Sequence, residues 1–195
     1  MHTYTLSPTG RRTTLVLLLT ALAIWAFALW SFRSTLGIDA NPFALRAMPS
    51  NLTISQIIPA LLMLVLIIAT PFLIWNLLEE WAARYTPTDK GLVFESLGIN
   101  VEYAWDAMEA IRTRDADSDD PFDEVILSRS FADQIRNPLL RFLHVQAYGS
   151  KRLPIYSGLA ERDELLAIIR ERAGLNPEAP GEANPTPEQP SSQPH

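Results

Sequence analysis

Residues 13–32, TTLVLLLTALAIWAFALWSF, form a run of 20 residues without a charged side chain, and arginines flank the run on both sides. As an α-helix this run would be about 30 Å long, which matches the hydrocarbon thickness of a bilayer. A cleaved secretory signal peptide is the alternative, with Ala26-Phe27-Ala28 as its cleavage site. Because the apolar run continues past these residues to Phe32, we expect a membrane anchor.

A second uncharged run follows at residues 54–78, ISQIIPALLMLVLIIATPFLIWNLL. Its length allows it to cross a bilayer with some tilt, and prolines are tolerated in such helices. Neither run carries an ionisable residue, whereas transporters and proton relays normally place at least one inside the membrane. The two runs therefore predict an anchoring hairpin of transmembrane helices, joined by an external loop at residues 33–53.

The basic residues predict the orientation of this hairpin, because cytoplasmic flanks carry the excess of lysine and arginine. The side shared by both termini has four basic residues and the connecting loop has two: Arg11, Arg12, Arg84 and Lys90 against Arg33 and Arg46. This bias predicts a cytoplasmic N-terminal tail at residues 1–12 and a cytoplasmic soluble domain after the second helix.

The charge balance of residues 84–175 excludes one class of function. This segment has 12 lysines and arginines against 16 aspartates and glutamates, and the whole chain has a net charge of −6 and no cysteine. A nucleic-acid-binding protein needs a basic stripe that neutralises phosphates, so we expect no nucleic-acid partner. The lack of cysteine excludes disulfides and thiolate metal sites.

Short strands alternating with turn signals are predicted for residues 84–175. Segments 92–97 and 99–103 are expected to be strands, and so is the short apolar segment 125–127. The alternation of residues 144–148 predicts another strand, joined by Gly149-Ser150 in a hairpin to residues 153–156. An amphipathic helix at 161–173 ends at Gly174. We expect its apolar face to pack on the sheet through Val101, Trp105 or Val125; that face comprises Leu165, Leu166, Ile168 and Ile169.

The order of these parts resembles the bacterial pleckstrin-homology-like (bPH, DUF304-type) membrane proteins. The segments that carry the resemblance are Tyr85–Leu92, Val101–Met108 with Ile111, Arg136–Leu143 and Ile155–Leu159. Pro87 and Ala104 depart from the residues usual in that family. The resemblance implies a membrane-anchored α+β protein, in which a PH-like antiparallel β-barrel or sandwich at 84–175 is capped by the C-terminal helix. It also implies a bacterial inner-membrane location, and it carries no catalytic motif.

The candidate sites are few. Residues 115–120, DADSDD, begin like a calcium-binding EF-hand loop but lack its glycine and its final glutamate, so we expect a solvated acidic loop. His144 is the only histidine between the chain termini, and the sequence supplies no partner for it, so we interpret it as a strand residue. Trp81 and Tyr85 are expected at the lipid interface and Trp105 in the β core. The best local basic group, a candidate contact for anionic headgroups or a partner, is Arg136, Arg141, Lys151 and Arg152.

These observations predict a non-enzymatic, membrane-anchored interaction module, a scaffold or accessory protein, with no cofactor and with a membrane or cytoplasmic protein as partner. Two alternatives stay open: a small accessory subunit of a transport or energy-converting membrane complex, and a lipid-sensing module. Residues 176–195 have six prolines between positions 177 and 194, and this composition predicts a disordered tail.

Overall fold

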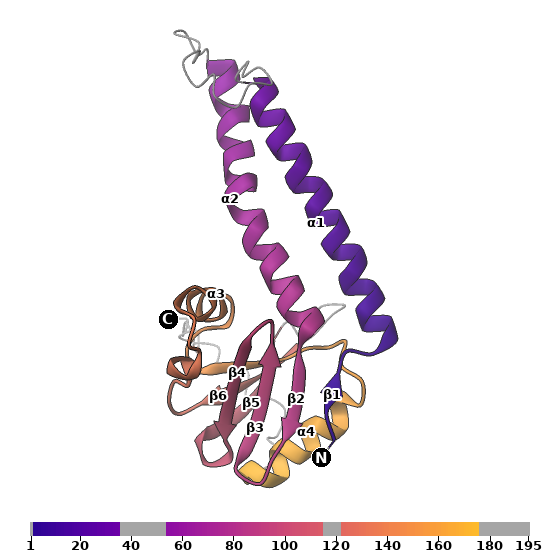
Figure 1. Cartoon of the computed structure of the whole chain (residues 1–195), viewed down its shortest axis with the longest axis vertical. Helices are drawn as coiled ribbons and strands as arrows, with labels where there is room; N and C mark the ends of the chain where they lie inside the picture. The colour runs from indigo at the N-terminus through magenta and orange to yellow at the C-terminus, as the bar shows by residue number, and fades with distance from the viewer. Residues whose placement is uncertain (1, 36–53, 115–121, 176–195) are drawn as a thin grey trace, which may run out of the picture.

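The computed structural model describes residues 2–35, 54–114 and 122–175. Most of the expected external loop, the EF-hand-like segment 115–120 and the proline-rich tail 176–195 lie outside these residues. The described residues form an α+β protein with two long helices, two antiparallel sheets and two shorter helices (Figure 1).

Two helices, α1 (Pro8–Thr35) and α2 (Ile54–Ala82), are long and apolar enough to cross a membrane. They lie side by side and extend away from the rest of the protein (Figure 1). Ala21 and Ala28 are buried where the helices meet, and the Trp25 indole nitrogen donates a hydrogen bond to the Ile67 carbonyl at 3.2 Å. Little of either apolar segment is otherwise covered by protein. The helix of a soluble core would be mostly buried, whereas these two helices leave most of their apolar side chains exposed, as membrane-spanning helices do.

Both helices are longer than the apolar runs that predict them. Pro8 begins α1, and the Ser7 hydroxyl accepts a hydrogen bond from the Gly10 amide at 3.0 Å. Proline suits the first helical position because its missing N–H would have no partner there. At the other end, α2 continues to Ala82 and is followed almost at once by a strand.

The N-terminal segment is not a tail. Residues Tyr4–Thr5 form strand β1, which pairs antiparallel with β2 (Arg84–Pro87) through the partners Tyr4 and Tyr85. Tyr4 is buried. The prediction of a free tail at residues 1–12 is therefore wrong, because the first strand of the domain precedes α1 and the second follows α2.

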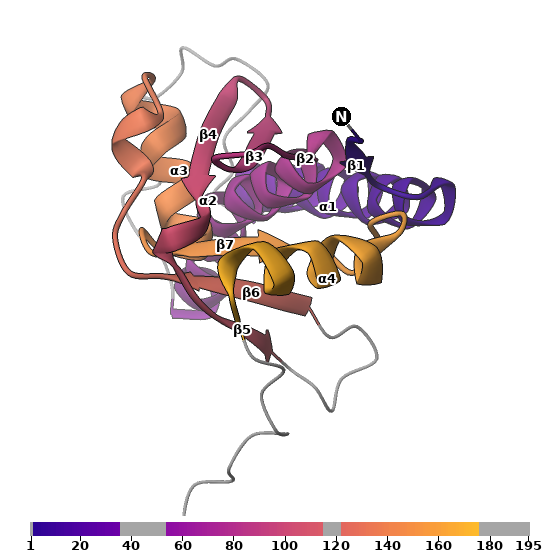
Figure 2. The ribbon, with the colours of Figure 1, turned by 90° about the horizontal axis from the view of Figure 1, so that it is seen from below.

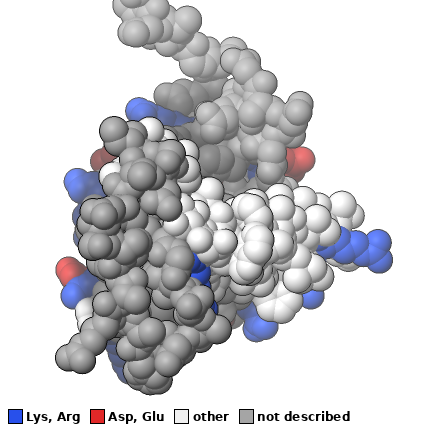
Figure 3. Space-filling view, turned by 90° about the horizontal axis from the view of Figure 1, so that it is seen from above, with Lys and Arg blue, Asp and Glu red and all other residues white. Residues whose placement is uncertain are grey.

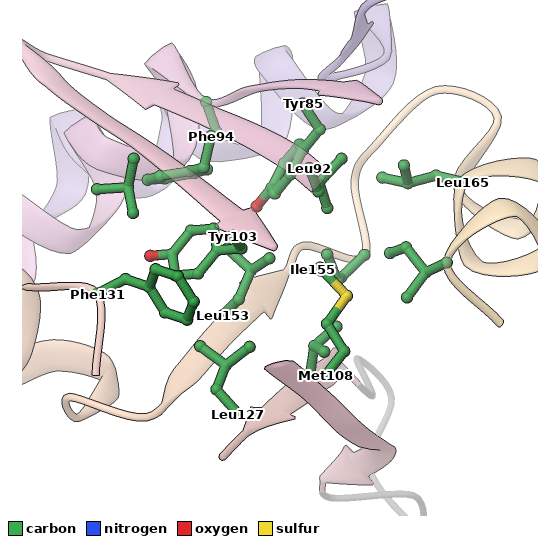
Figure 4. Close-up of a cluster of buried hydrophobic side chains, with 14 of the residues drawn as sticks. Tyr85, Leu92, Phe94, Tyr103, Met108, Leu127, Phe131, Leu153, Ile155 and Leu165 are labelled. Carbon is green, nitrogen blue, oxygen red and sulfur yellow. The ribbon is translucent and has the colours of Figure 1, made fainter. Parts of the chain in front are cut away.

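Two separate antiparallel sheets replace the closed barrel that was one form of the prediction. The first has the order β1-β2-β3-β4, where β3 is Gly91–Ser96 and β4 is Ile99–Ala104. The second has the order β5-β6-β7, formed by Met108–Arg114, Phe122–Leu127 and Arg152–Ile155. A short 3₁₀ turn, η1 (Trp105–Ala107), carries the chain from one sheet to the other. In Figure 4 side chains of both sheets point toward one another, among them Phe94, Tyr103, Leu127 and Leu153.

The C-terminal helix is confirmed as α4 (Arg162–Ala173), which runs along the two sheets (Figure 2). Leu165 and Ile169 are fully buried, and α4 contacts η1, where the Arg172 guanidinium lies 5.8 Å from the Trp105 ring centroid. Gly174 has a φ of 66° and ends the helix in the left-handed conformation that glycine adopts without strain.

The strand expected at residues 144–148 is wrong. Residues Pro138–Tyr148 form helix α3, which follows the short turn η2 (Ala132–Gln134). The Asn137 side chain accepts hydrogen bonds from the amides of Leu139 and Leu140, at 2.9 and 3.4 Å, and so caps the helix start. Leu140, His144 and Tyr148 then recur every four residues on the inner face, a helical period that outweighs the alternation of Val145 and Ala147. Consequently β7 pairs with β6 instead of with a preceding hairpin strand.

Candidate functional site

The last turn of α2 joins the long helix to the domain. Only Ala83 separates the end of α2 from the start of β2, so there is no linker between them. Glu79, in this last turn, has an exposed fraction of 0%, and His144 of α3 has 3%. A buried carboxylate and a buried imidazole therefore meet where α2, α3 and the first sheet come together.

Hydrogen bonds hold Glu79 from three directions. One carboxylate oxygen, Oε1, lies 2.5 Å from His144 Nδ1, and the other, Oε2, accepts a hydrogen bond from the Trp75 indole at 2.9 Å. The Ser96 hydroxyl, at the end of β3, donates to the Glu79 backbone carbonyl at 2.6 Å. Since a carboxylate only accepts hydrogen bonds, the proton between Glu79 and His144 lies on the imidazole Nδ1 when the acid is ionised.

Aromatic side chains enclose the pair. The Tyr103 hydroxyl lies 3.4 Å from His144 Nε2, and the rings of Phe94 and Tyr148 lie 5.8 and 5.5 Å from the imidazole centroid. Burial, and the nearby Glu79 carboxylate, raise the pKa of Tyr103 and that of Tyr148. Both phenols are therefore neutral hydrogen-bonding groups at physiological pH.

The arrangement of Glu79 and His144 joins two helices. No serine, threonine or lysine side chain is hydrogen-bonded to His144 among the described contacts, as a nucleophile activated by it would be. Within the described ranges no three histidine, aspartate or glutamate side chains are grouped as metal ligands. The pair instead joins α2 to α3, because separating them would leave a buried charge without a partner.

Sequence reasoning missed this pair. The sequence alone leads to the expectation of His144 on a strand without a partner, and it assigns no role to Glu79. The available signal was an acidic residue four positions after Trp75 at the end of an apolar helix, together with the one internal histidine. Their separation of 65 residues hides the pairing from any local pattern.

The predicted basic residues take part in separate local contacts. Arg141 pairs with Asp133 at 3.1 Å, and Arg152 pairs with Glu124 at 3.3 Å. The Lys151 ammonium donates to the Ser128 carbonyl at 3.0 Å, and Arg136 is exposed between η2 and α3. Arg141 also lines a shallow cavity of about 410 Å³ beside α3, to which Phe142 and Ser150 contribute.

The three aromatic residues singled out in the sequence have different places. Trp105 belongs to the core, as expected, and Trp81 is half exposed on α2. Tyr85 was expected at the lipid interface, and this is wrong: it is fully buried and donates a hydrogen bond to the Pro154 carbonyl at 2.6 Å. Arg84 and Tyr85 are the first residues of β2 and lie on opposite faces of the strand. Arg84 is exposed, and Tyr85 points into the space between the two sheets (Figure 4).

Comparisons of the chain with protein-family models, with curated proteins and with solved structures found no match. The structure itself defines the class of protein: an α+β domain with an apolar two-helix hairpin inserted between its first two strands.

Proposed function

We propose that the protein is a non-enzymatic interaction module anchored in the inner membrane of a bacterium. Helices α1 and α2 cross the bilayer as a hairpin, and the α+β domain lies at the cytoplasmic surface. The observation that carries this proposal is the buried contact between Glu79 and His144, which builds the end of α2 into the domain. A domain joined in this way keeps a constant orientation to the membrane, which is what a scaffold for a partner needs.

The sheet pairing supports the same arrangement. Because β1 precedes α1 and pairs with β2 after α2, both ends of the hairpin emerge on one side. Cleavage after Ala28 would remove β1, whose Tyr4 is buried in the domain core, so the pairing also supports an anchor over a signal peptide. The excess of basic residues on this side favours the cytoplasm.

The arrangement of strands supports the resemblance to bPH membrane proteins. Two antiparallel sheets with a C-terminal helix across them agree with the sandwich form that the resemblance implies. A fold of this kind hosts many binding roles and does not by itself determine one. The interaction role therefore rests on the rigid attachment and on the domain surface that it presents.

Photo-crosslinking in cells tests the proposal. A photoreactive residue would replace an exposed domain residue, Lys90 or Glu109, or an exposed hairpin residue, Leu19 or Val65. We expect a specific protein adduct from the domain positions and lipid adducts from the hairpin positions. Protein adducts from Leu19 or Val65 alone would contradict the proposal, and would favour the accessory-subunit alternative, in which the helices form the interface.

A further inference from the structure

Helix α3 carries most of the large apolar side chains that the domain exposes. Outside α1 and α2, the large hydrophobic side chains that are exposed among the described residues number three: Leu97, Leu139 and Phe142. Leu139 and Phe142, with exposed fractions of 61% and 56%, lie on α3. On the opposite face of the same helix His144 is buried against Glu79. One face of α3 is therefore covered by the domain, and the other face presents Leu139 and Phe142.

The third residue belongs to the same surface. Leu97 is in the turn between β3 and β4, and a Cβ atom on the next residue, Gly98, would lie 3.6 Å from the Leu140 side chain of α3. The preceding residue, Ser96, donates its hydrogen bond to Glu79 of α2. The exposed apolar residues of the domain thus lie beside the end of α2, and we call Leu97, Leu139 and Phe142 the α3 surface.

The residues of α2 that face α3 show where the α3 surface lies along the hairpin. A cavity of about 270 Å³ lies between the helices, with Ala69, Phe72 and Asn76 on one side and Leu143, Gln146 and Ala147 on the other. Residues 69–76 lie within the last three turns of the uncharged run, and they span about 10 Å of helix. Helix α3 therefore flanks the part of α2 that passes from the acyl chains to the headgroups.

The direction of α3 fits this position. In Figure 1 α2 runs along the long axis of the molecule while α3 is seen end-on, and Figure 2 shows α3 lengthwise. The axis of α3 thus lies across the hairpin, which is parallel to the plane of a membrane that the hairpin crosses. Seen from the end of the hairpin, uncharged side chains cover a broad area, and basic side chains with a few acidic ones lie around it (Figure 3).

We propose that α3 is an interfacial helix, whose surface residues Leu139 and Phe142 insert at the boundary between headgroups and acyl chains of the leaflet beside the domain. This inference rests on the proposed function, because it needs α2 to span the bilayer. Helices that lie in the membrane–water interface bury their apolar face about 5–10 Å deep. Leu97 adds an apolar contact beside them.

The basic side chains beside the α3 surface suit a lipid partner, but they are not the main source of the binding free energy. Arg136 and Arg141 lie at the start and on the side of α3, where anionic headgroups would attract them. Asp133, which is exposed and 3.1 Å from Arg141, offsets part of this attraction. The insertion of apolar side chains is therefore the main contribution, and anionic lipid the smaller one.

Site-directed spin labelling of the full chain tests the inference, since the protein has no cysteine to remove. Single cysteines would be introduced as Phe142→Cys, Leu139→Cys, Val65→Cys and Lys90→Cys, all at exposed positions. Each labelled protein would be reconstituted in vesicles of phosphatidylcholine and phosphatidylglycerol. The collision rate of each label with oxygen, which concentrates in lipid, would be compared with that of a water-soluble nickel chelate.

We expect the labels at 142 and 139 to favour oxygen over the chelate, as the label at 65 does, and the label at 90 to favour the chelate. A label at 142 that resembles position 90, while position 65 resembles lipid, would overturn the interfacial helix and leave the anchored module intact. Low collision rates with both reagents at 142 would also overturn it, because a protein contact would then cover the helix. If position 65 is itself accessible to the chelate, the proposed membrane hairpin fails.

Discussion

Glu79 and His144 join the last turn of α2 to α3, and each is the other's closest polar partner. Removal of one member leaves the other buried and uncompensated, which typically costs about 3–5 kcal/mol. We therefore expect Glu79→Ala to lower the free energy of unfolding of the domain by about that amount. Denaturant titration of the detergent-solubilised chain, followed by tryptophan fluorescence, measures this change, since Trp75 donates to the same carboxylate.

Two further variants sharpen that test. Glu79→Gln keeps one oxygen that can accept from His144 but cannot accept from Trp75 as well, so its loss should be intermediate. Glu109→Ala is the control, because it removes a carboxylate from an exposed position of β5 and should change stability by no more than about 0.5 kcal/mol. Equal unfolding midpoints for Glu79→Ala and Glu109→Ala would show that the buried pair does not join the helix to the domain.

The tyrosines predict how stability depends on pH. Burial raises the pKa of all five of them, in the case of Tyr4 to about 12 from the ordinary value of 10.0, with a hydrogen bond to Glu164 as the next cause. A group whose pKa is higher in the folded state than in the unfolded chain stabilises the fold fully below the unfolded value. This contribution is lost as the pH rises from about 10 through the folded-state pKa.

We therefore expect the denaturant midpoint to fall as the pH increases above about 10. The phenolate absorbance should stay low until the protein unfolds and should then rise together with the loss of structure. Tyr4→Phe should reduce the steepness of this fall but not abolish it, because four buried phenols remain. Phenolate absorbance that rises at its ordinary pH in the folded protein would contradict the prediction.

At the scale of the elements, α4 contributes Leu165, Leu166 and Ile169 to the hydrophobic core. Leu165 and Ile169 are fully buried in the hydrophobic core, and Figure 4 shows Leu165 beside side chains of the sheets. Truncation of one buried leucine or isoleucine to alanine costs about 2–5 kcal/mol, and the total stability of a domain is about 5–15 kcal/mol. Leu165→Ala with Ile169→Ala should therefore unfold the domain or nearly so, as measured by near-ultraviolet circular dichroism and limited proteolysis.

The control for α4 must avoid its polar contacts with the N-terminal strand. Glu164 accepts a hydrogen bond from the Tyr4 hydroxyl at 2.9 Å, so Glu164→Ala would also weaken the attachment of β1. Glu171→Ala is the matched control, because Glu171 is exposed on the same helix. A wild-type melt for the Leu165/Ile169 double variant would mean that α4 is not part of the core.

At the scale of the whole molecule, the domain is discontinuous in sequence. Residues 2–7 lie with residues 84–175, and the hairpin is inserted between them: the Ser7 amide donates to the Gly158 carbonyl at 2.9 Å, and the Ala160 amide to the Thr5 carbonyl at 2.9 Å. A Cβ on Gly10 would lie 2.5 Å from the Gly158 carbonyl oxygen, so the start of α1 packs directly on the domain. Truncation to residues 84–175 would therefore remove an edge strand and the buried end of α2.

The discontinuous domain predicts the sidedness of three positions. Cysteines introduced at Thr3 and Lys90 should be on the same side of the membrane, because β1 and β2 pair, and a cysteine at Ser34 should be on the other. With an impermeant thiol reagent on intact cells, we expect labelling of Ser34→Cys alone. Labelling of Thr3→Cys and Lys90→Cys, with Ser34→Cys protected, would reverse the orientation and keep the hairpin. Opposite results for positions 3 and 90 would contradict the hairpin itself.

Local sequence determined the parts of this protein that depend on a short period or a strong signal. Charge-free runs specify the two long helices, and the strand–turn–strand pattern around Leu97-Gly98 specifies β3 and β4. The amphipathic period with acids first, arginines last and Gly174 at the end specifies α4. In each case the residues that decide the element are contiguous in the sequence.

Tertiary structure decided the rest, because the deciding contacts join residues far apart in the chain. Tyr4–Thr5 is too short to predict as a strand and becomes one only because the edge of β2 is available to it. Residues 138–148 satisfy two periods, and the contact of His144 with Glu79 favours the helical one. In the sequence, Glu79 resembles an ordinary charge at the end of a membrane helix. Its burial depends on packing against α3, which is distant in the chain, and not on the identity of the residue.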